Sequence, residues 1–222
     1  MKNTLQFLSR LKSNNNREWF EKNKKQYEIS NDETKALAAS LESLIREFDE
    51  LEPSGTKIYR IYRDVRFSND KTPYKITRSM SFTRAGEERR GGYYVQIQPG
   101  QSFLATGFWG PEPADLLHIR KQISQDSEQL RKVLDGKSFK SYFGELYGDQ
   151  LKTAPKGFEK DDPAIDLLRY KQFILTHSFT DEEVLAPNFA SLVAAGYKKA
   201  MPFLNCMTEM LITDLNGVPL IR

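Results

Sequence analysis

Residues 60–75, RIYRDVRFSNDKTPYK, bring together arginines, lysines, two aspartates and aromatic side chains. Between residues 57 and 78, seven Lys or Arg and two Asp give a net charge of +5, whereas the whole chain of 222 residues carries +3. Guanidinium and ammonium groups at this spacing bind phosphates and carboxylates. Because concentrated charge attracts anions more strongly than spread charge, an anionic ligand is the first chemistry to consider.

The candidate ligand-binding residues are Arg60, Arg63, Asp64, Arg66, Asp70, Lys71, Tyr74, Lys75 and Arg78. In this hypothesis Asp64 orients a guanidinium, and Tyr62, Tyr74 or Tyr94 offers a hydroxyl or a stacking surface. If the ligand is turned over, Asp64 or Asp70 would be the base. No motif names a reaction, so the sequence leaves open whether the protein is an enzyme.

A β meander must position these residues. From Thr56 to Trp109 the side chains alternate with a period of two, and β-branched and aromatic types dominate, as is typical of strands. The pattern predicts strands over about 57–67, 76–84, 92–98 and 102–109. Pro99 and Gly100 occupy the central positions of a type II turn, so at least the last two strands should be antiparallel.

Helices should flank the meander. Before it, apolar spacing predicts a helix that ends near 14–16, a helix that begins with a capping box of Asn15 and Glu18, and a helix from about 32 that ends at Pro53 and Gly55. After it, the spacing predicts a helix over 116–134, ended by Gly136, and helices near 163–170, 181–198 and 202–213. We expect an α+β fold, with an antiparallel sheet of about four strands packed on N-terminal and C-terminal helices. A single domain over 1–222 would be helical over 1–55, a β meander over 56–110 and mostly helical over 111–222.

Alternation sorts the meander into two faces. The face expected to pack on the helices carries Ile61, Val65, Phe67, Met80, Phe82, Tyr93, Val95 and Ile97. The other face carries Arg60, Tyr62, Asp64, Arg66, Ser79, Ser81, Thr83, Tyr94, Gln96 and Gln98. This polar face is either the solvated side of an antiparallel sheet or the floor of a polar pocket.

Arg63 falls on the apolar face, where a buried charge needs a carboxylate or a bound anion. The alternatives are a bulge that turns the side chain outward and a stem that lies along apolar surface. Residues 68–74 have the composition of a turn, which either connects two strands in solvent or holds a phosphate or carboxylate. Asp64 and Asp70 are too far apart on one strand for a paired acid and base, so we interpret them as partners of neighbouring arginines.

Other chemistries have little support. The single cysteine, Cys206, has the setting of a packing residue, and neither His118 nor His177 has a second ligand at metal-binding spacing. His177, at an expected helix end, is considered only as a general base. We expect no metal and no cofactor. No signal peptide or membrane span is evident in the sequence, and one cysteine fits a reducing compartment, so we expect a cytoplasmic location.

The chain resembles the domain of unknown function 2461 family, whose members are conserved hypothetical proteins of bacteria and some fungi. Near the N-terminus, the resemblance rests on residues 15–20, NNREWF. The central motif is residues 60–67 with 70–75. The remaining matches are residues 92–94, 119–120, 155–158, 162–163 and 167–169. The resemblance covers nearly the whole chain and implies no activity, cofactor or catalytic residue.

Three functions remain. The first is a cytoplasmic domain with a basic, Arg-rich pocket for a small anionic ligand, which would be a nucleotide, a phosphorylated metabolite or a carboxylate, with an enzymatic activity left open. The second is a nucleic-acid-binding module that uses the cations on phosphates and tyrosines on bases. In the third, the arginines and aspartates form a structural ion-pair network and the domain contacts other proteins. The oligomeric state is not predicted.

Overall fold

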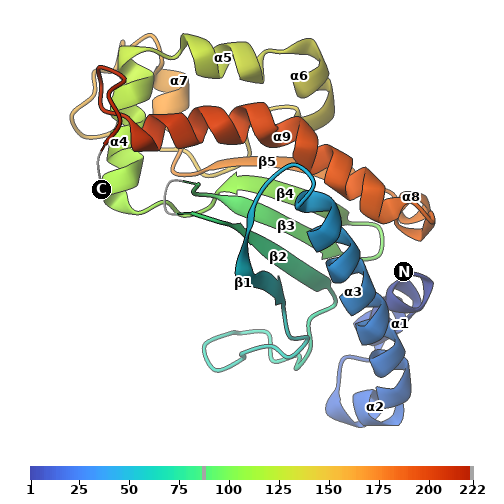
Figure 1. Ribbon diagram of the computed structural model, residues 1–222. Helices are drawn as coiled ribbons and strands as arrows, with labels where there is room; N and C mark the ends of the chain where they lie inside the picture. The colour runs from blue at the N-terminus through green and yellow to red at the C-terminus, as the bar shows by residue number, and fades with distance from the viewer. Residues whose placement is uncertain (87–88, 221–222) are drawn as a thin grey trace. The chain divides into compact units, whose positions relative to one another are not determined.

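The computed structural model describes residues 1–86 and 89–220 (Figure 1). The described helices are α1 (Lys2–Ser13), α2 (Arg17–Lys22), α3 (Lys24–Ile45), α4 (Pro113–Gln125), α5 (Glu128–Leu134), α6 (Lys137–Phe143), α7 (Ile165–Leu168), α8 (Asp181–Leu185) and α9 (Phe189–Ile212). The described strands are β1 (Leu51–Ile58), β2 (Arg78–Arg84), β3 (Gly92–Ile97), β4 (Ser102–Phe108) and β5 (Phe173–Phe179). They form one sheet in the order β1-β2-β3-β4-β5.

The predicted α+β fold is confirmed, with a five-stranded antiparallel sheet in place of about four strands. β2, β3 and β4 lie within two residues of their predicted bounds. The type II turn is also present, since Gln101 donates its N–H to the Gln98 carbonyl at 2.9 Å and Gly100 has φ +72°. That positive φ is the reason for glycine at this position.

The first strand differs most from the prediction. α3 begins at Lys24 and ends at Ile45, and β1 already starts at Leu51, so Pro53 and Gly55 lie inside a strand and do not end a helix. The pairing of β1 with β2 shifts register between Leu51 and Thr56, and Pro53 and Gly55 lie within this irregular stretch. Position 55 favours glycine, because the Cβ of any other residue would lie only 2.9 Å from the Thr83 carbonyl oxygen.

The C-terminal half contains β5 where no strand was predicted. Three consecutive residues of it, Phe173, Ile174 and Leu175, are buried, and a run this short and apolar does not distinguish a strand from a helix. The predicted helix over 116–134 is divided into α4 and α5, and α6 follows it. The break predicted before 202 is absent, since α9 continues through Pro202.

Contacts divide the chain into two compact units. Unit 1 contains residues 1–85, 93–104 and 178–196, and unit 2 contains residues 86–92, 105–177 and 197–222. In unit 2, Gly107 has φ +128° and an added Cβ would lie 2.2 Å from the Phe173 carbonyl oxygen, so β4 and β5 approach closely only with glycine there. The prediction of one domain over 1–222 stays a prediction.

In unit 1, α3 lies along β1 and β2 (Figure 1). A separate aromatic and aliphatic cluster joins α1 and α2 to the chain after β1, and consists of Phe7, Leu8, Leu11, Phe20, Ile61 and Tyr74 with Trp19 and Tyr27 at its edge. Phe20 is fully buried and stacks on Tyr74 with ring centroids 4.0 Å apart. This cluster therefore holds the helical N-terminus and the 60–75 segment together.

Among the described helices, none is long and apolar enough to cross a membrane.

Phe20→Ala should lower the free energy of unfolding by about 3–5 kcal/mol, because it removes a buried ring and leaves a cavity under Tyr74. Denaturant unfolding followed by circular dichroism measures this change. Phe67→Ala is the matched control, because Phe67 is 97 % exposed and should change the free energy by less than about 0.5 kcal/mol. Equal effects of the two substitutions would contradict the role given to the cluster.

Candidate functional site

The segment between β1 and β2, residues 59–77, is the basic loop. β1 ends at Ile58, so the predicted strand to residue 67 is wrong, and the two arms of the loop instead pair with each other. Tyr62 and Tyr74 form an isolated bridge, the Arg63 N–H donates to the Pro73 carbonyl at 2.9 Å, and the Lys75 N–H donates to the Ile61 carbonyl at 2.7 Å. These backbone hydrogen bonds join the two arms of the loop to each other.

Tyr74 fastens the base of the loop to the N-terminal helices. The Asn15 side chain donates to the Tyr74 carbonyl at 2.9 Å and accepts the Tyr74 N–H at 3.1 Å. Asn16 caps α2 by accepting the Trp19 N–H at 2.9 Å, so the predicted capping role of Asn15 is wrong. Because its ring is buried against Phe20, Tyr74 anchors the loop to the N-terminal helices.

Arg63 is partly buried and has a carboxylate partner within the loop. Its guanidinium forms an ion pair with Asp70, donates to the Thr72 hydroxyl and lies 3.4 Å from the Ser68 hydroxyl. The Thr72 N–H and the Arg63 guanidinium lower the pKa of Asp70 to about 2. A buried guanidinium at this position was expected to need either a carboxylate or a bound anion. The structure provides a carboxylate, that of Asp70.

Arg66 also pairs with a neighbour. Its guanidinium donates to both carboxylate oxygens of Asp64, from Nε to Oδ1 at 3.0 Å and from Nη2 to Oδ2 at 2.6 Å, and this hydrogen bonding lowers the pKa of Asp64. The predicted burial of Val65 and Phe67 is wrong, since Val65 is partly exposed and Phe67 is 97 % exposed with Arg66 over its ring. The alternation fails here because the chain has left the sheet.

Arg78 lies in the interior, 1 % exposed. It donates to Asn31 at 2.6 Å, lies over the Tyr27 ring, and has no carboxylate partner among the described residues. Burial lowers the pKa of its guanidinium. Arg78 packs beside α3, so it is separated by burial from the exposed cations of the basic loop.

Besides the buried Arg78, four of the seven cations between residues 57 and 78 lack an ion-pair partner among the described residues: Lys57, Arg60, Lys71 and Lys75. Lys71 donates to the Val65 carbonyl at 3.0 Å. Lys57 and Lys75 place their ammonium groups 5.1 and 5.6 Å from the centroid of the Tyr59 ring. Two cations therefore share one aromatic ring at the base of the loop.

The ring of Tyr59 continues into a row of aromatic side chains on the polar face of the sheet. Tyr94 lies 6.2 Å from Tyr59 and 5.9 Å from Phe103, measured between centroids, and all three are partly exposed. The predicted sorting holds for most of β2 and β3, since Met80, Phe82, Tyr93, Val95 and Ile97 are buried, whereas Ser81, Thr83, Tyr94 and Gln96 are partly or fully exposed. The placement of Ser79 on the exposed polar face is wrong, because Ser79 is buried at the start of β2. The sequence interpretation did not name Lys57, Tyr59 or Phe103 as candidates, because the alternation that places Ile61 on the apolar face places Lys57 and Tyr59 there too, and Phe103 is itself apolar.

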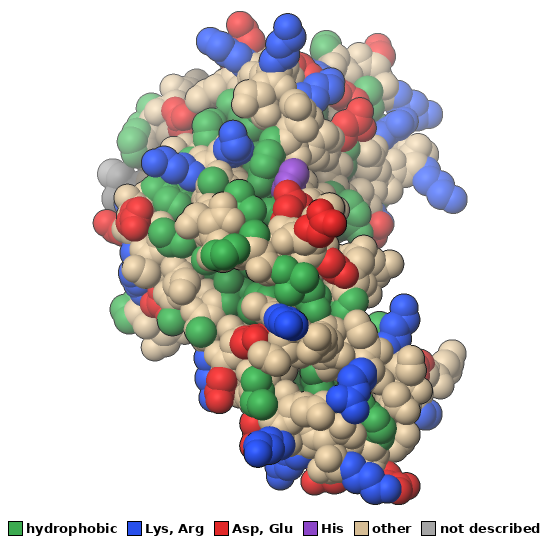
Figure 2. Space-filling model, turned by 90° about the vertical axis from the view of Figure 1, so that its right-hand side faces the viewer, with side chains coloured by type: hydrophobic (Ala, Val, Ile, Leu, Met, Phe, Trp, Pro, Cys, Tyr) green, Lys and Arg blue, Asp and Glu red, His purple; other side chains and the backbone are tan. Residues whose placement is uncertain are grey.

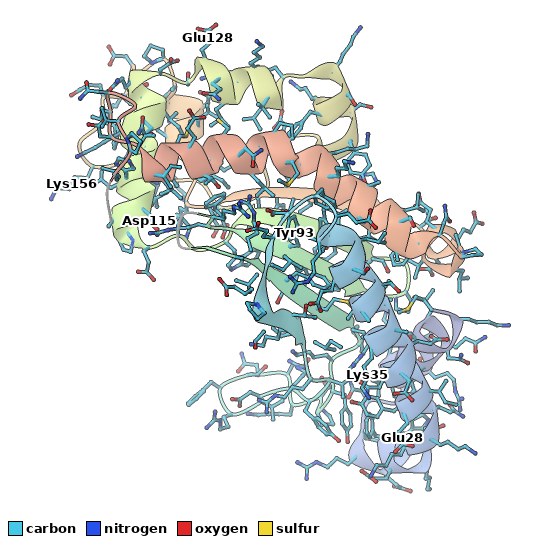
Figure 3. All side chains as sticks on the ribbon, viewed as in Figure 1. Glu28, Lys35, Tyr93, Asp115, Glu128 and Lys156 are labelled. Carbon is cyan, nitrogen blue, oxygen red and sulfur yellow. The ribbon has the colours of Figure 1, made fainter. Side chains whose placement is uncertain are left out.

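On the buried side of the same strands lies an ion pair. Arg84 donates to Asp49 at 2.6 Å, and the Tyr93 hydroxyl donates to the same carboxylate at 2.5 Å. Burial and the neighbouring carboxylate raise the pKa of Tyr93. Tyr93 lies near the end of α3 that leads into β1 (Figure 3), so this group ties the helix to the sheet.

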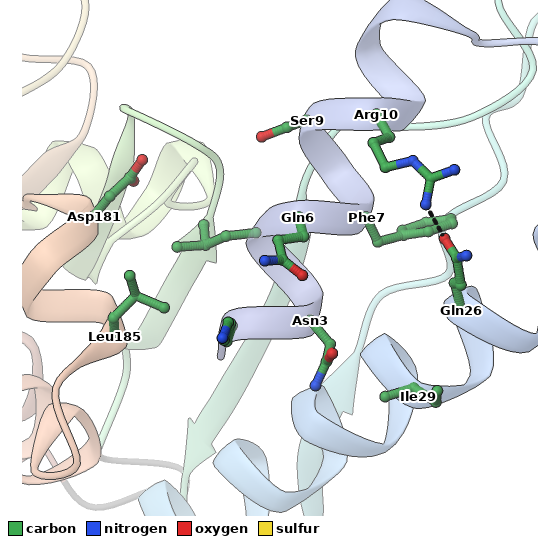
Figure 4. A pocket seen from close by; sticks show the side chains of 11 residues that line it. Asn3, Gln6, Phe7, Ser9, Arg10, Gln26, Ile29, Asp181 and Leu185 are labelled. Carbon is green, nitrogen blue, oxygen red and sulfur yellow. Dashed lines mark hydrogen bonds between the residues drawn. The ribbon is translucent and has the colours of Figure 1, made fainter.

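Two cavities lie away from the basic loop. In unit 1, a cavity of about 710 Å³ lies between α1, α3 and α8, where Phe7, Ile29 and Leu185 line it and Arg10 donates to Gln26 at 2.5 Å (Figure 4). In unit 2, a cavity of about 530 Å³ is lined by the end of α4, the start of α5, and Pro163 and Ala164. Neither of these two cavities includes a residue of the basic loop.

The remaining polar candidates have structural partners. His118 and His177 contact the carbonyls of Thr213 and Tyr142, each at 2.8 Å, and His177 lies in β5 instead of at a helix end. Cys206 is buried in α9, and burial raises its pKa to about 11. In the described parts of the chain, no three His, Cys, Asp or Glu side chains come together to hold a metal ion.

On the face shown in Figure 2, basic side chains are scattered among acidic and hydrophobic ones.

A family model described as a conserved hypothetical protein, DUF2461, matches residues 3–205. The chain belongs to this family. The DUF2461 match includes the basic loop, the polar sheet face and the buried Asp49 group. No curated protein and no solved structure matches the chain.

Within this DUF2461 chain, the motif residues near 15 and 60–75 have two roles. Asn15, Phe20 and Tyr74 anchor the loop, and Arg63 with Asp70 shapes its outer part. Arg60, Lys71 and Lys75 remain available at the surface or near it. The motif therefore forms an anchored loop that carries cations without an ion-pair partner among the described residues.

The Asp70 carboxyl should titrate with a midpoint of about 2 when followed by NMR. Its pKa is lowered in the folded loop, so the ion pair with Arg63 is complete above about pH 4 and is lost as the pH falls through about 2. Arg63→Ala should move the midpoint upward, although the Thr72 N–H keeps it below the ordinary value. A wild-type midpoint near 4 would show that the pair does not form.

Asp49→Asn should lower the free energy of unfolding by about 3–5 kcal/mol, because it removes the charge from a buried pair with Arg84. Denaturant unfolding measures the change. Asp32→Asn is the control, since the pair of Asp32 with Lys35 is exposed and contributes less than about 1 kcal/mol. A small loss for Asp49→Asn would mean that the buried pair does not hold the sheet to α3.

Proposed function

We propose that the protein binds an anionic ligand with the basic loop and the polar sheet face beside it. Phosphate or carboxylate groups are the chemistry that these cations recognise, so the ligand would be a nucleotide, a phosphorylated metabolite or a carboxylate. The observation that carries the proposal is the pair of ammonium groups, Lys57 and Lys75, over the single ring of Tyr59 without a carboxylate partner among the described residues.

Two like charges held near one ring repel each other, and an anion bound between them removes that repulsion. The Tyr59 ring adds a cation–π attraction that keeps both side chains at the site in the absence of ligand. The Tyr59 hydroxyl, 3.3 Å from the Ser81 hydroxyl, offers a hydrogen bond next to them. The surface is therefore partly organised before binding, which lowers the entropy cost of capture.

The arginines at the centre of the sequence hypothesis have a different role in this proposal. Arg63 and Arg66 already bind Asp70 and Asp64, and an anion would have to compete with those carboxylates. Their pairing supports the structural alternative for these two residues. The contact residues of the proposed site are Lys57, Tyr59, Arg60, Lys71 and Lys75.

We assign no reaction to this surface. A cytoplasmic location remains part of the proposal and fits the free, buried thiol of Cys206.

Thermal unfolding in the presence of inorganic pyrophosphate, AMP and citrate tests the proposal. An anion at one hundred times its dissociation constant stabilises the native state by about 2.7 kcal/mol, which at this length raises the melting midpoint by roughly 5–11 °C. The double substitution Lys57→Ala, Lys75→Ala should abolish the rise and leave the unliganded midpoint nearly unchanged. Lys25→Ala, which removes one exposed positive charge from α3, should retain it.

The substitution Arg63→Ala distinguishes a structural role of Arg63 from a role in anion binding. It should lower the midpoint without ligand, because Asp70 and Thr72 lose their partner, and the folded variant should still respond to the anion. A full rise in the double lysine variant would place the anion elsewhere. The absence of a rise with all three anions would overturn the proposed function.

A further inference from the structure

The polar sheet face next to the proposed anion site carries a row of rings that no small anion needs. Tyr59 is the first residue of the basic loop after β1, Tyr94 lies in β3 and Phe103 in β4, and all three belong to unit 1. Their centroids are separated by steps of 6.2 and 5.9 Å. Aromatic side chains that are partly exposed in a row across neighbouring strands form a stacking surface for bases.

The spacing distinguishes between forms of nucleic acid. Bases in a helical stack follow one another at about 3.4 Å, which is much less than the steps between these rings. The rings are also tilted, by 62° between Tyr59 and Tyr94 and by 43° between Tyr94 and Phe103. Each ring thus presents a separate surface, which suits the splayed bases of an extended single strand and not a continuous duplex.

Hydrogen-bonding groups line the same face. The Tyr94 hydroxyl donates to Gln96 at 2.9 Å, and the Gln96 amide donates to Gln98 at 3.1 Å. These groups are partly exposed and satisfy one another in the absence of ligand. Amide and hydroxyl groups bind base edges in single strands, so they can exchange partners when a base stacks beside them.

Cations gather at the Tyr59 end of the row. Lys57 and Lys75 flank its ring, and the basic loop adds Arg60 and Lys71. At the outer part of the loop, Phe67 is 97 % exposed under the Arg66 guanidinium and offers one more ring for stacking. A polymer with a phosphate at every base would use the cations and the rings together.

We infer that the anionic ligand is single-stranded nucleic acid. The bases stack on Tyr59, Tyr94 and Phe103, and Lys57, Arg60, Lys71 and Lys75 neutralise the phosphates. This inference rests on the proposed anion-binding function and names its ligand class. A single nucleotide would use only one end of the surface, so a strand of several nucleotides should bind more tightly than AMP.

Fluorescence anisotropy with a labelled ten-nucleotide strand of mixed sequence, as RNA and as DNA, tests the inference. Four neutralised phosphates predict a slope of about −3 in a plot of log K against log salt, since each phosphate on a single strand contributes roughly −0.7. The double substitution Lys57→Ala, Lys75→Ala should make that slope about 1.4 less steep. The corresponding duplex should bind more weakly than the single strand.

Substitution of the aromatic rings gives a second test, because binding through charge alone would not depend on these rings. Tyr94→Leu and Phe103→Leu keep apolar residues on the strands and should weaken binding about 5- to 150-fold each, with the salt slope unchanged. Tyr147→Leu is the control, because Tyr147 is 57 % exposed in unit 2 and should leave binding unchanged. Melting midpoints confirm that each variant is folded.

The outcomes separate the inference from the proposed function. If pyrophosphate or AMP binds through Lys57 and Lys75 while the ten-nucleotide strand binds no more tightly than AMP, the inference fails and the anion site stands. If the duplex binds as tightly as the single strand, or the leucine variants bind normally, the stacking surface is wrong. If neither anions nor oligonucleotides bind, both proposals fail.

Discussion

The stacking of Tyr74 on Phe20 is the interaction on which the functional surface depends. The ring of Tyr74 is buried in the N-terminal cluster, and its backbone is held at both polar groups by the side chain of Asn15. This double attachment fixes one arm of the basic loop, and the bridge to Tyr62 then fixes the other arm. Without the anchor, residues 57–78, which carry seven cations, would repel one another and would not hold Lys75 beside Lys57.

Pairing of charges, and not their number, decides which cations can act on a ligand. Each aspartate of the loop is bound to an arginine of the loop, and both carboxylates have lowered pKa values, Asp64 chiefly through Arg66 and Asp70 through the Thr72 N–H and Arg63. Three of the four cations left over, Lys57, Lys71 and Lys75, carry strongly hydrated ammonium groups, whereas the paired guanidinium groups of Arg63 and Arg66 are held in contacts with carboxylates. The segment thus combines a stiff frame of arginine and aspartate with flexible lysines at its base.

The sequence predicted those parts of the fold where one periodic pattern covers a whole element. Alternation placed Met80, Phe82, Tyr93, Val95 and Ile97 in the interior, and the Pro99 and Gly100 turn was recognisable from local chemistry alone. It failed beyond Ile58, because a loop that pairs with itself shows the same alternation as a strand that joins a sheet. The pairings of Arg63 and Arg66 with aspartates were anticipated, but the burial of Tyr74 and Arg78 depends on α2 and α3, which are distant in sequence. β5 was missed because its apolar residues carry no period.

The register shift in β1 has a consequence for the edge of the sheet. β1 is a terminal strand in the order of the sheet, and such strands present unpaired backbone groups to other chains. Pro53 has no N–H to offer, and the irregular pairing between Leu51 and Thr56 bends the strand away from a straight template. The first part of β1 is therefore a poor partner for a further strand, which protects a twisted sheet with one polar face from edge-to-edge aggregation.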